Sequence, residues 1–568
     1  MKTGILNPPT KWLRSGKAGG LGGLSIADRD WWIKKTRPVT GIRRARPGVL
    51  WWVVATALGL GRNPIAAAGN PSAEAAAARS RWVDFDPGGK LVYRSLQQGD
   101  RIMDFSSAGY MGGGVAIPSV PVRAVVNPSG GNATSAIQEA INAVSNLDLV
   151  DGFRGAVLLK PGVYECQDLL VIRASGVVLR GSGSGTNGTT LRMAGKPHIC
   201  VSLSGSSHTK RVGQVARMVD SYVPSGANSF RVDDASSFSP GDTIMISRPV
   251  TPTWVRFMSM DTLVRQGRKE TWLSESGWIE SERVVNSVAG NTITLDVPLS
   301  DSFDAKYLSP PGGSLVKYVV SGRICQAGVE HLRIVAPPQA VEIRQRHHQA
   351  IRMSGVCDGW LNDIAIEDTV GSVGLDGSVK RVTVERVRIS HSVATKGSAK
   401  PADFSANGSQ ILFNRCSATG SNLFYFVTGA RATGPNVLLN CTFYGNGHIQ
   451  PHQRWATGLL VDGCQVPESG IDFMNRGEMG SGHGWTIGWA VAWNCVARSY
   501  VIQQPPGAMN WAVGCKGGHT QSGMPFGHET KLPEGLFDSP GTPVVPTSLY
   551  LAQLRERLGP LAVKNIGY

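Results

Sequence analysis

The sequence has few of the residues that mark common enzyme folds. Charged residues make up 17% and aromatic residues 7% of its 568 residues. No Cys-x-x-Cys pair occurs, which argues against a cysteine-based metal site. The glycine-rich stretches 112–114 and 181–188 do not open a helix after a strand, so neither has the spacing of a dinucleotide- or phosphate-binding loop. What is abundant is glycine, with 70 residues, which fits buried strands joined by many turns and predicts an all-β fold.

A short phrase recurs in the C-terminal half: an apolar run, then Asn, Asp or Gly, then Cys. The steps between its five cysteines are 25, 23, 31 and 20 residues. The five are Cys416, Cys441, Cys464, Cys495 and Cys515. A roughly fixed period of this kind is typical of a solenoid. We expect the thiols to form a buried, inward-facing column, which Leu332, Ile364 and Val387 extend to earlier rungs.

The strongest positive charge lies at the N-terminus, where the first 68 residues carry 12 Lys and Arg against 2 Asp and Glu. Arg43 and Arg44 precede the apolar run 49–60, which is too short to span a bilayer and is followed by alanines up to Ala68. This pattern predicts a signal peptide, cleaved near Ala68, with an uncleaved anchor as the alternative. We therefore expect a secreted or periplasmic protein with no stable membrane anchor and no nucleic-acid partner.

Residues 155–191, GAVLLKPGVYECQDLLVIRASGVVLRGSGSGTNGTTL, read as short β runs broken by Gly, Pro and Ser. Before them, apolar residues recur at helical spacing: Ile137, Ala140, Ile141 and Val144. Ser135 and Gln138 predict a capping box at the start of that helix. A helix followed by these runs, over about residues 127–193, resembles the start of right-handed parallel β-helix proteins of the pectate-lyase-like superfamily. The resemblance implies a carbohydrate-active protein.

The expected fold is an all-β, right-handed parallel β-helix with an N-terminal capping helix, a β-rich insertion and a C-terminal cap. The rung phrase is missing from about 209 to 320, which predicts the insertion, and Leu551, Leu554 and Leu558 predict a short helix that closes the far end. The expected organisation has five parts: 1–68, leader and signal peptide; 69–208, N-terminal region, cap helix and first rungs; 209–320, insertion; 321–520, main rungs; 521–568, C-terminal tail and capping helix.

Polar loops separate the cysteine-bearing strands. Arg431, Arg454 and Arg476 are 23 and 22 residues apart, one per rung, and rungs stack about 4.8 Å apart. Adjacent guanidiniums repel unless an anion compensates them, so we expect an arginine ladder that binds carboxylate or sulfate groups of a glycan. The alternative is that each arginine braces its own turn. Three more loop residues complete the expected substrate-binding set: Trp455, Asn475 and His448.

Elimination is the first expected reaction on a uronate-containing glycan. It needs a cation to offset the carboxylate, a base for the proton at C5 and an acid for the leaving oxygen. The arginine ladder suits the first role. His452 or Lys400 is the expected base, and Tyr425 or His483 the expected acid.

Hydrolysis is the second candidate, and a non-catalytic glycan-binding or envelope protein is the third. Hydrolysis needs two carboxylates about 5–9.5 Å apart, and the candidates are Asp403, Asp472 and Glu478. The Asp-rich calcium constellation of pectate lyases and the paired aspartates of polygalacturonases are missing, so the resemblance does not select a reaction.

The expected partner is a polysaccharide substrate, and the expected oligomeric state is a monomer. No cofactor and no metal ligand set is expected, with calcium left open. His448 and His452 are separated by Pro451, so they do not form a zinc pair on one helix face. Four cysteines outside the repeat are the candidates for disulfides: Cys166, Cys200, Cys325 and Cys357.

Overall fold

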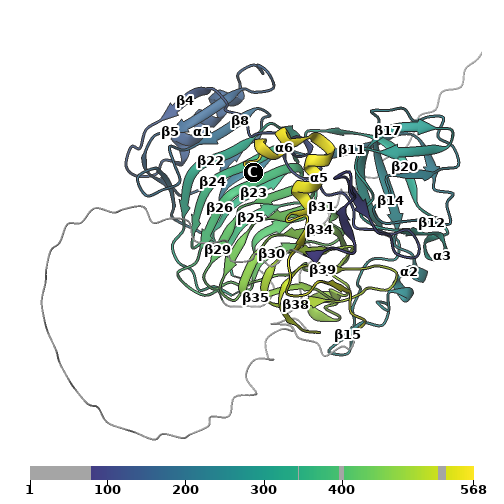
Figure 1. Cartoon of the computed structure of the whole chain (residues 1–568). Coiled ribbons are helices and arrows are strands. Elements are labelled where there is room, and N and C mark those ends of the chain that lie inside the picture. Colours follow the sequence, from purple (N-terminus) through teal and green to yellow (C-terminus); the bar gives the residue numbers. More distant parts are fainter. Residues whose placement is uncertain (1–77, 343–344, 396–401, 522–531) are drawn as a thin grey trace, which may run out of the picture. The chain divides into compact units, whose positions relative to one another are not determined.

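The computed structural model describes residues 78–342, 345–395, 402–521 and 532–568. The leader, the signal peptide and Lys400 lie outside these residues. Within the described part, no helix is both long and apolar enough to cross a membrane. Most strands belong to one large, mainly parallel sheet that winds into the expected right-handed β-helix (Figure 1).

The coil has three walls of parallel strands. The first, here called the groove wall, pairs its strands in this order: β7 (Leu170–Ile172), β10 (Ile199–Ser204), β23 (Gln349–Ser354), β25 (Gly371–Leu375), β27 (Ala402–Ala406), β30 (Phe424–Thr428) and β33 (His448–Ile449). The second wall contains β5 (Gly155–Leu159), β8 (Val177–Arg180), β22 (Gly328–Val335), β24 (Val356–Glu367), β26 (Lys380–Ser390), β28 (Ser409–Asn414), β31 (Thr433–Leu439), β34 (Ala456–Asp462), β37 (Val491–Trp493) and β39 (Trp511–Val513).

The third wall uses the C-terminal parts of β22, β24 and β26 together with shorter strands. These are β6 (Gly162–Cys166), β9 (Thr189–Met193), β29 (Ser417–Thr419), β32 (Thr442–Tyr444), β35 (Gln465–Phe473) and β38 (Val496–Ile502). Because strand side chains alternate, each wall sends one set of side chains into the coil and the other set outward.

The buried column predicted from the cysteine repeat is confirmed. Leu332 pairs with Ile364, and Ile364 pairs with Val387 in the next rung. The five repeat cysteines are buried free thiols. Each Sγ donates to a carbonyl one rung earlier, as Cys495 does to Val461 at 3.1 Å. The thiols therefore pack as small core side chains that also satisfy their one donor.

The predicted N-terminal cap is helix α1 (Thr134–Ser145). It buries Ile137, Ile141 and Val144 against the first strands. Its N-cap is Ala133, whose side chain cannot accept a hydrogen bond, so the predicted capping box at Ser135 is wrong. Gln138 instead pairs with the backbone of Val171 in β7, donating from Nε2 at 3.0 Å and accepting at 2.8 Å. This amide covers polar groups on the first strand that would otherwise face water.

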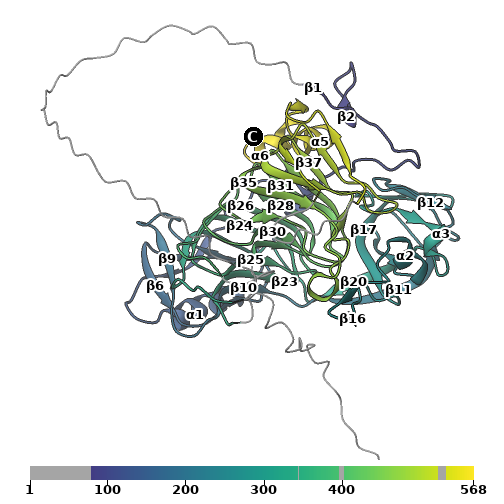
Figure 2. The same cartoon turned by 90° about the horizontal axis from the view of Figure 1, so that it is seen from below.

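The insertion folds as an antiparallel six-stranded sheet beside the coil (Figure 2). Its order is β11 (His208–Arg217), β20 (Ser314–Ser321), β14 (Thr243–Pro249), β17 (Trp278–Ala289), β18 (Thr292–Leu295) and β13 (Ser229–Arg231). It shares one apolar core with outward side chains of the second wall, including Leu460 and Trp493. Trp254, in the short helix α2 (Pro252–Phe257), and Trp272 are buried in this core.

Helices α5 (Leu549–Leu558) and α6 (Pro560–Asn565) end the chain. The expected closing helix therefore forms, but it packs along the side of the coil, against β34, and not across its far end (Figure 1). Asp462 at the end of β34 holds it there, because its Oδ2 accepts from Ser548 Oγ at 2.7 Å and from Tyr550 N at 2.8 Å.

Candidate functional site

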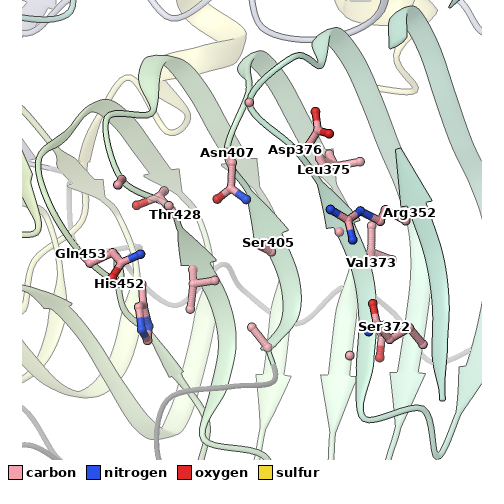
Figure 3. Close-up of a pocket in the computed structure, with 18 of the residues that line it drawn as sticks. Arg352, Ser372, Val373, Leu375, Asp376, Ser405, Asn407, Thr428, His452 and Gln453 are labelled. Carbon is pink, nitrogen blue, oxygen red and sulfur yellow. The ribbon is translucent and has the colours of Figure 1, made fainter. Parts of the chain in front are cut away.

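A groove of about 550 Å³ lies on the outer side of the groove wall (Figure 3). Its lining comes from four successive strands, β23, β25, β27 and β30, and from the loops beside them, including the loop that follows β33. The insertion, α5 and α6 cover the second wall instead, so they do not fill this groove. The groove therefore runs across the rungs, along the axis of the coil.

The floor of the groove is formed by outward-facing residues that are paired from one strand to the next. Arg352 pairs with Gly374, Gly374 with Ser405, and Ser405 with Val427. A Cβ placed on Gly374 would meet nothing within 4 Å, so this glycine leaves open space beside the arginine. The Arg352 side chain is exposed and makes no hydrogen bond or ion pair with any described residue. It is thus a cation available to a ligand in the groove.

Polar side chains border the groove where the strands end. Asp376 follows β25, Asn407 follows β27, and Thr428 ends β30 (Figure 3). The Asp376 carboxylate accepts from the backbone N of Ser378 at 2.9 Å, which fixes its direction. Among the described lining residues, Arg352 is the only Lys or Arg and Asp376 the only carboxylate. The rest of the lining offers mainly amides, hydroxyls and backbone.

His452 lines the other end of the groove, beneath which Arg476 is fully buried. Arg476 Nη1 lies 3.2 Å from His452 Nδ1 and 2.9 Å from its carbonyl oxygen. A guanidinium can only donate, so Nδ1 accepts and the ring proton sits on Nε2. The ring can then donate from Nε2 but has no lone pair left for a substrate proton. The structure therefore contradicts the expected role of His452 as the base.

Burial acts on the same arginine. It lowers the pKa of Arg476 to about 9, because the charged form is costly without water, while Asp472 partly offsets the effect. The guanidinium also lies over the Phe424 ring at 5.7 Å, and His452 meets Phe424 and His483 edge-on. Arg476 therefore supports His452 from below and is not exposed to substrate.

The expected arginine ladder does not form. Arg431 and Arg454 are neighbours, since Arg431 N donates to Arg454 O at 2.9 Å, but the next backbone bond goes from Arg454 to His483 and not to Arg476. The side chain of Arg454 donates to Ser481 Oγ at 2.7 Å, and that of Arg431 to Trp278 O at 3.3 Å. These arginines brace loops, which was the alternative interpretation, and none lines the groove.

The two expected catalytic aspartates are fully buried and far apart. Asp403 accepts from His391 Nε2 at 2.8 Å and from Asn422 Nδ2 at 2.9 Å. Asp472 accepts from His448 Nδ1 and Gln450 Nε2, both at 2.7 Å. Their strands are three pairings apart, or about 14 Å at the usual strand spacing. This exceeds the separation that either glycosidase geometry uses, so the structure contradicts Asp403 and Asp472 as a pair and makes His448 a buried partner of Asp472.

His391 and Asp403 form a buried pair, with Nε2 2.8 Å from Oδ1. Burial alone would lower the pKa of His391, but the Asp403 carboxylate outweighs it, so the pKa is raised. Asp403 is therefore a structural partner of His391.

Two aromatic candidates are also buried. The Tyr425 hydroxyl lies 2.6 Å from the carbonyl of Gly420 and 2.7 Å from that of Tyr444, and burial raises its pKa. Trp455 is buried between the coil and the insertion, where its Nε1 donates to Asp301 Oδ2 at 2.7 Å. Neither side chain can reach a substrate, so the expected acid and the expected sugar contact are both wrong.

The loop 475–483 holds the remaining candidates, and none of them lines the groove. Asn475 accepts from Gly477 N at 2.8 Å and shapes the turn. Glu478 is half-buried at the start of α4 (Met479–Gly482), and His483 is buried at its end. The position of Lys400 is outside the described residues. Of the residues chosen from the sequence, only His452 lines the groove.

Sequence reasoning missed Arg352 and Asp376. The rungs that carry them have no cysteine phrase, and their loops differ in length, so nothing in the sequence alone aligned them. The segment Ile351-Arg352-Met353 does carry a usable signal. A charged residue stands there between two apolar residues that face inward, so its side chain must face outward.

One group of potential metal ligands exists in the described part of the chain. Cys325, Cys357 and Asp358 have ligand atoms within 4.8 Å of one another. Thiols do not suit calcium, which prefers oxygen ligands, and the group is not among the residues that line the groove.

Comparison with known proteins gives weak likenesses. No family model matches the chain, and no curated protein matches it either. Among solved structures, the tailspike gp61 of Pseudomonas phage phi297 shares 12% identity over 72% of this chain and 73% of its own, with a TM-score of 0.31. The AP22 phage tailspike, solved with an Acinetobacter baumannii capsular saccharide, shares 12% over 73% of each chain, with a TM-score of 0.27.

A third similar structure is the A-module of a mannuronan C-5 epimerase from Azotobacter vinelandii. It shares 11% identity over 69% of this chain and 72% of its own, with a TM-score of 0.32. Placement in the pectate-lyase-like superfamily stays a prediction.

Proposed function

We propose that the groove binds a linear acidic polysaccharide and that the protein cleaves it by β-elimination. The observation that carries this proposal is Arg352, an exposed guanidinium in the groove with no partner among the described residues. An exposed, unpaired cation that lines a groove suits an anionic ligand, and the planar guanidinium matches a carboxylate with two parallel hydrogen bonds.

The shape and lining of the groove support a polymer of sugars. The groove crosses four strands and reaches the loop after β33, four strand spacings of about 4.8 Å in all, which gives room for several sugar units in a row. Its amides and hydroxyls, such as Gln349, Ser405 and Asn407, can each exchange hydrogen bonds with sugar hydroxyls. A compact cofactor would not need this length.

The charges in the groove favour elimination over hydrolysis. A hydrolase of the usual kind needs two carboxylates that flank the scissile bond, and the described lining contains one. Elimination needs a cation, a base and an acid. Arg352 and Asp376 supply the cation and the base from neighbouring strands, and solvent water protonates the leaving oxygen as the C4–O bond breaks. Arg352 would offset the uronate carboxylate as charge moves onto it, and Asp376 would take the proton from C5.

His452 belongs to a different part of the same groove. Its strand is four pairings from that of Arg352, or about 19 Å. The two side chains cannot act on one sugar unit, so we assign His452 to the lining of the groove and not to the reaction. We also propose that the protein acts outside the cytoplasm, since the N-terminal charge pattern predicts export.

The test is incubation of the purified protein with a panel of uronate polysaccharides. We expect ultraviolet absorbance from the conjugated C4–C5 double bond and its loss in Asp376→Asn. Asp168→Asn, an exposed carboxylate outside the groove, is the matched control and should keep full activity. New reducing ends without that absorbance would show that the protein is a hydrolase and not a lyase. Saturable binding with neither signal would reduce the proposal to a binding protein.

A further inference from the structure

Two cysteines face each other where the insertion rejoins the coil. Cys325 lies in β21 (Ile324–Cys325), directly after the last insertion strand, and pairs in register with Cys357 of β24. Neighbouring strands place paired Cα atoms about 4.8 Å apart. Disulfides span Cα separations of about 4.4–6.8 Å, so these two sulfurs can join without separating the strands.

Cys325 is also the accessible member of the pair. It is partly exposed, whereas the other eight cysteines of the chain are buried. A hydrogen bond with Cys357 lowers the pKa of Cys325 to about 7, and Arg381 and Arg323 act in the same direction. A thiolate is the attacking form of cysteine, so Cys325 is the one cysteine with both access and reactivity.

The surroundings argue against a metal ion at this place. Arg381 Nη2 donates to Asp358 Oδ2 at 2.6 Å and lies 3.3 Å from Cys357 Sγ. The guanidinium therefore occupies the position from which a cation would bind the carboxylate and the second thiol. The hydrogen bond with Cys325 and burial raise the pKa of Cys357, and the positive charge of Arg381 acts against that rise.

We propose that Cys325 and Cys357 form a thiol–disulfide exchange site that reacts with small disulfides. The Cys325 thiolate attacks one sulfur of the small disulfide, forms a mixed disulfide and releases one thiol. Cys357 then loses its proton to solvent, attacks the Cys325 sulfur and releases the second thiol. Two protein thiols are oxidised to one disulfide, and the small disulfide is reduced to two thiols.

The register makes Cys357 the resolving residue. Cys357 is buried, so a small disulfide reaches Cys325 first. Once Cys325 is bound to the small thiol, its hydrogen bond no longer raises the pKa of Cys357, and Arg381 remains beside the sulfur. The second step is thus intramolecular and needs no movement of the strands.

The experiment uses the whole reduced protein, treated with glutathione disulfide without oxygen and then mapped by mass spectrometry. We expect a Cys325–Cys357 crosslink in the native protein, while the seven other cysteines stay reduced and serve as internal controls. In Cys357→Ser, Cys325 should accumulate as a mixed disulfide with glutathione. In Cys325→Ser, no thiol should react.

Three results would overturn the proposal. The first is an unmodified Cys325 in the folded native protein under conditions that oxidise the unfolded chain. The second is a glutathione adduct on Cys325 that persists in the native protein. The third is one equivalent of zinc in the protein as purified, released when Cys325 is replaced. The mapping of the native chain decides the first two even if a variant does not fold.

Discussion

Arg352 and Gly374 occupy the same outward position on neighbouring strands, so the arginine in the groove floor stands next to a residue without a side chain. A larger side chain at 374 would fill the space where the proposed sugar lies. It would meet no protein atom within 4 Å at its Cβ, so the fold should tolerate it.

Gly374→Leu should therefore abolish substrate binding while the melting temperature stays within about 2 °C of the native value. Gly185→Leu is the matched control, because its Cβ would also meet nothing within 4 Å and the residue lies outside the groove. Binding is measured by calorimetry and folding by thermal melting. Unchanged binding in Gly374→Leu would show that the ligand lies elsewhere.

Replacing the cation tests the proposed chemistry more directly. Arg352→Gln should lower kcat/KM on a uronate polysaccharide at least about tenfold, or about 1.4 kcal/mol, because the substrate carboxylate loses its counter-charge. Arg431→Gln removes an equally exposed arginine outside the groove and should leave activity unchanged. If both variants lose activity to the same extent, the effect comes from net charge and not from the groove.

Replacing the loop arginine Arg454 should affect the stability of its loop and not the activity, unlike the replacement of Arg352. Its guanidinium holds Ser481 and Gly482, so Arg454→Ala should free the loop around α4. We expect faster proteolytic cleavage between 477 and 484, with kcat/KM within about twofold of native. Arg431→Ala, whose side chain makes one long bond to Trp278, is the control for cleavage. A tenfold loss of activity in Arg454→Ala but not in Arg431→Ala would show that Arg454 belongs to the functional site.

The fold was predictable because its signal is periodic and local. Each rung repeats an apolar run, and a Cys at one inward position marks the register, so Leu332 and Cys495 could be assigned to one column from spacing alone. The position of the C-terminal helix was not predictable. It depends on contacts with distant segments, among them the buried carboxylate of Asp462, which nothing in the sequence distinguishes from other aspartates, and the bond from Phe105 N to Gln553.

The site was predicted poorly for a related reason. Loops rich in Arg and His looked functional, but Arg454 and Arg476 are consumed by the carbonyl groups of their own turns and of His452. Backbone carbonyls have no sequence signature, so an arginine that braces a loop cannot be told from one that binds substrate by sequence alone. Whether an arginine such as Arg352 remains available to a ligand depends on which acceptors the fold places around it.

The buried carboxylate of Asp462 should make the stability of the protein depend on pH. Burial raises its pKa to about 7, although bonds from Tyr550 N and Ser548 Oγ favour the charged form. In the unfolded chain an aspartate titrates near about 3.9. Between about pH 4 and pH 7 the folded state therefore holds a proton that the unfolded state has lost. The free energy of unfolding falls as pH rises through this window and is constant above it.

Asp462→Asn should remove this dependence. The amide oxygen can still accept from Tyr550, and no charge has to be buried at high pH, so the variant should melt above the native protein at pH 8, with a gain of at most ~4 kcal/mol. At pH 4 the two should melt alike. Asp148→Asn, an exposed aspartate, should follow the native curve throughout. If the melting temperature of Asp462→Asn instead follows the native curve from pH 4 to pH 8, Asp462 is ionised in the folded protein throughout this range. The helix α5 would then be held by a charged carboxylate.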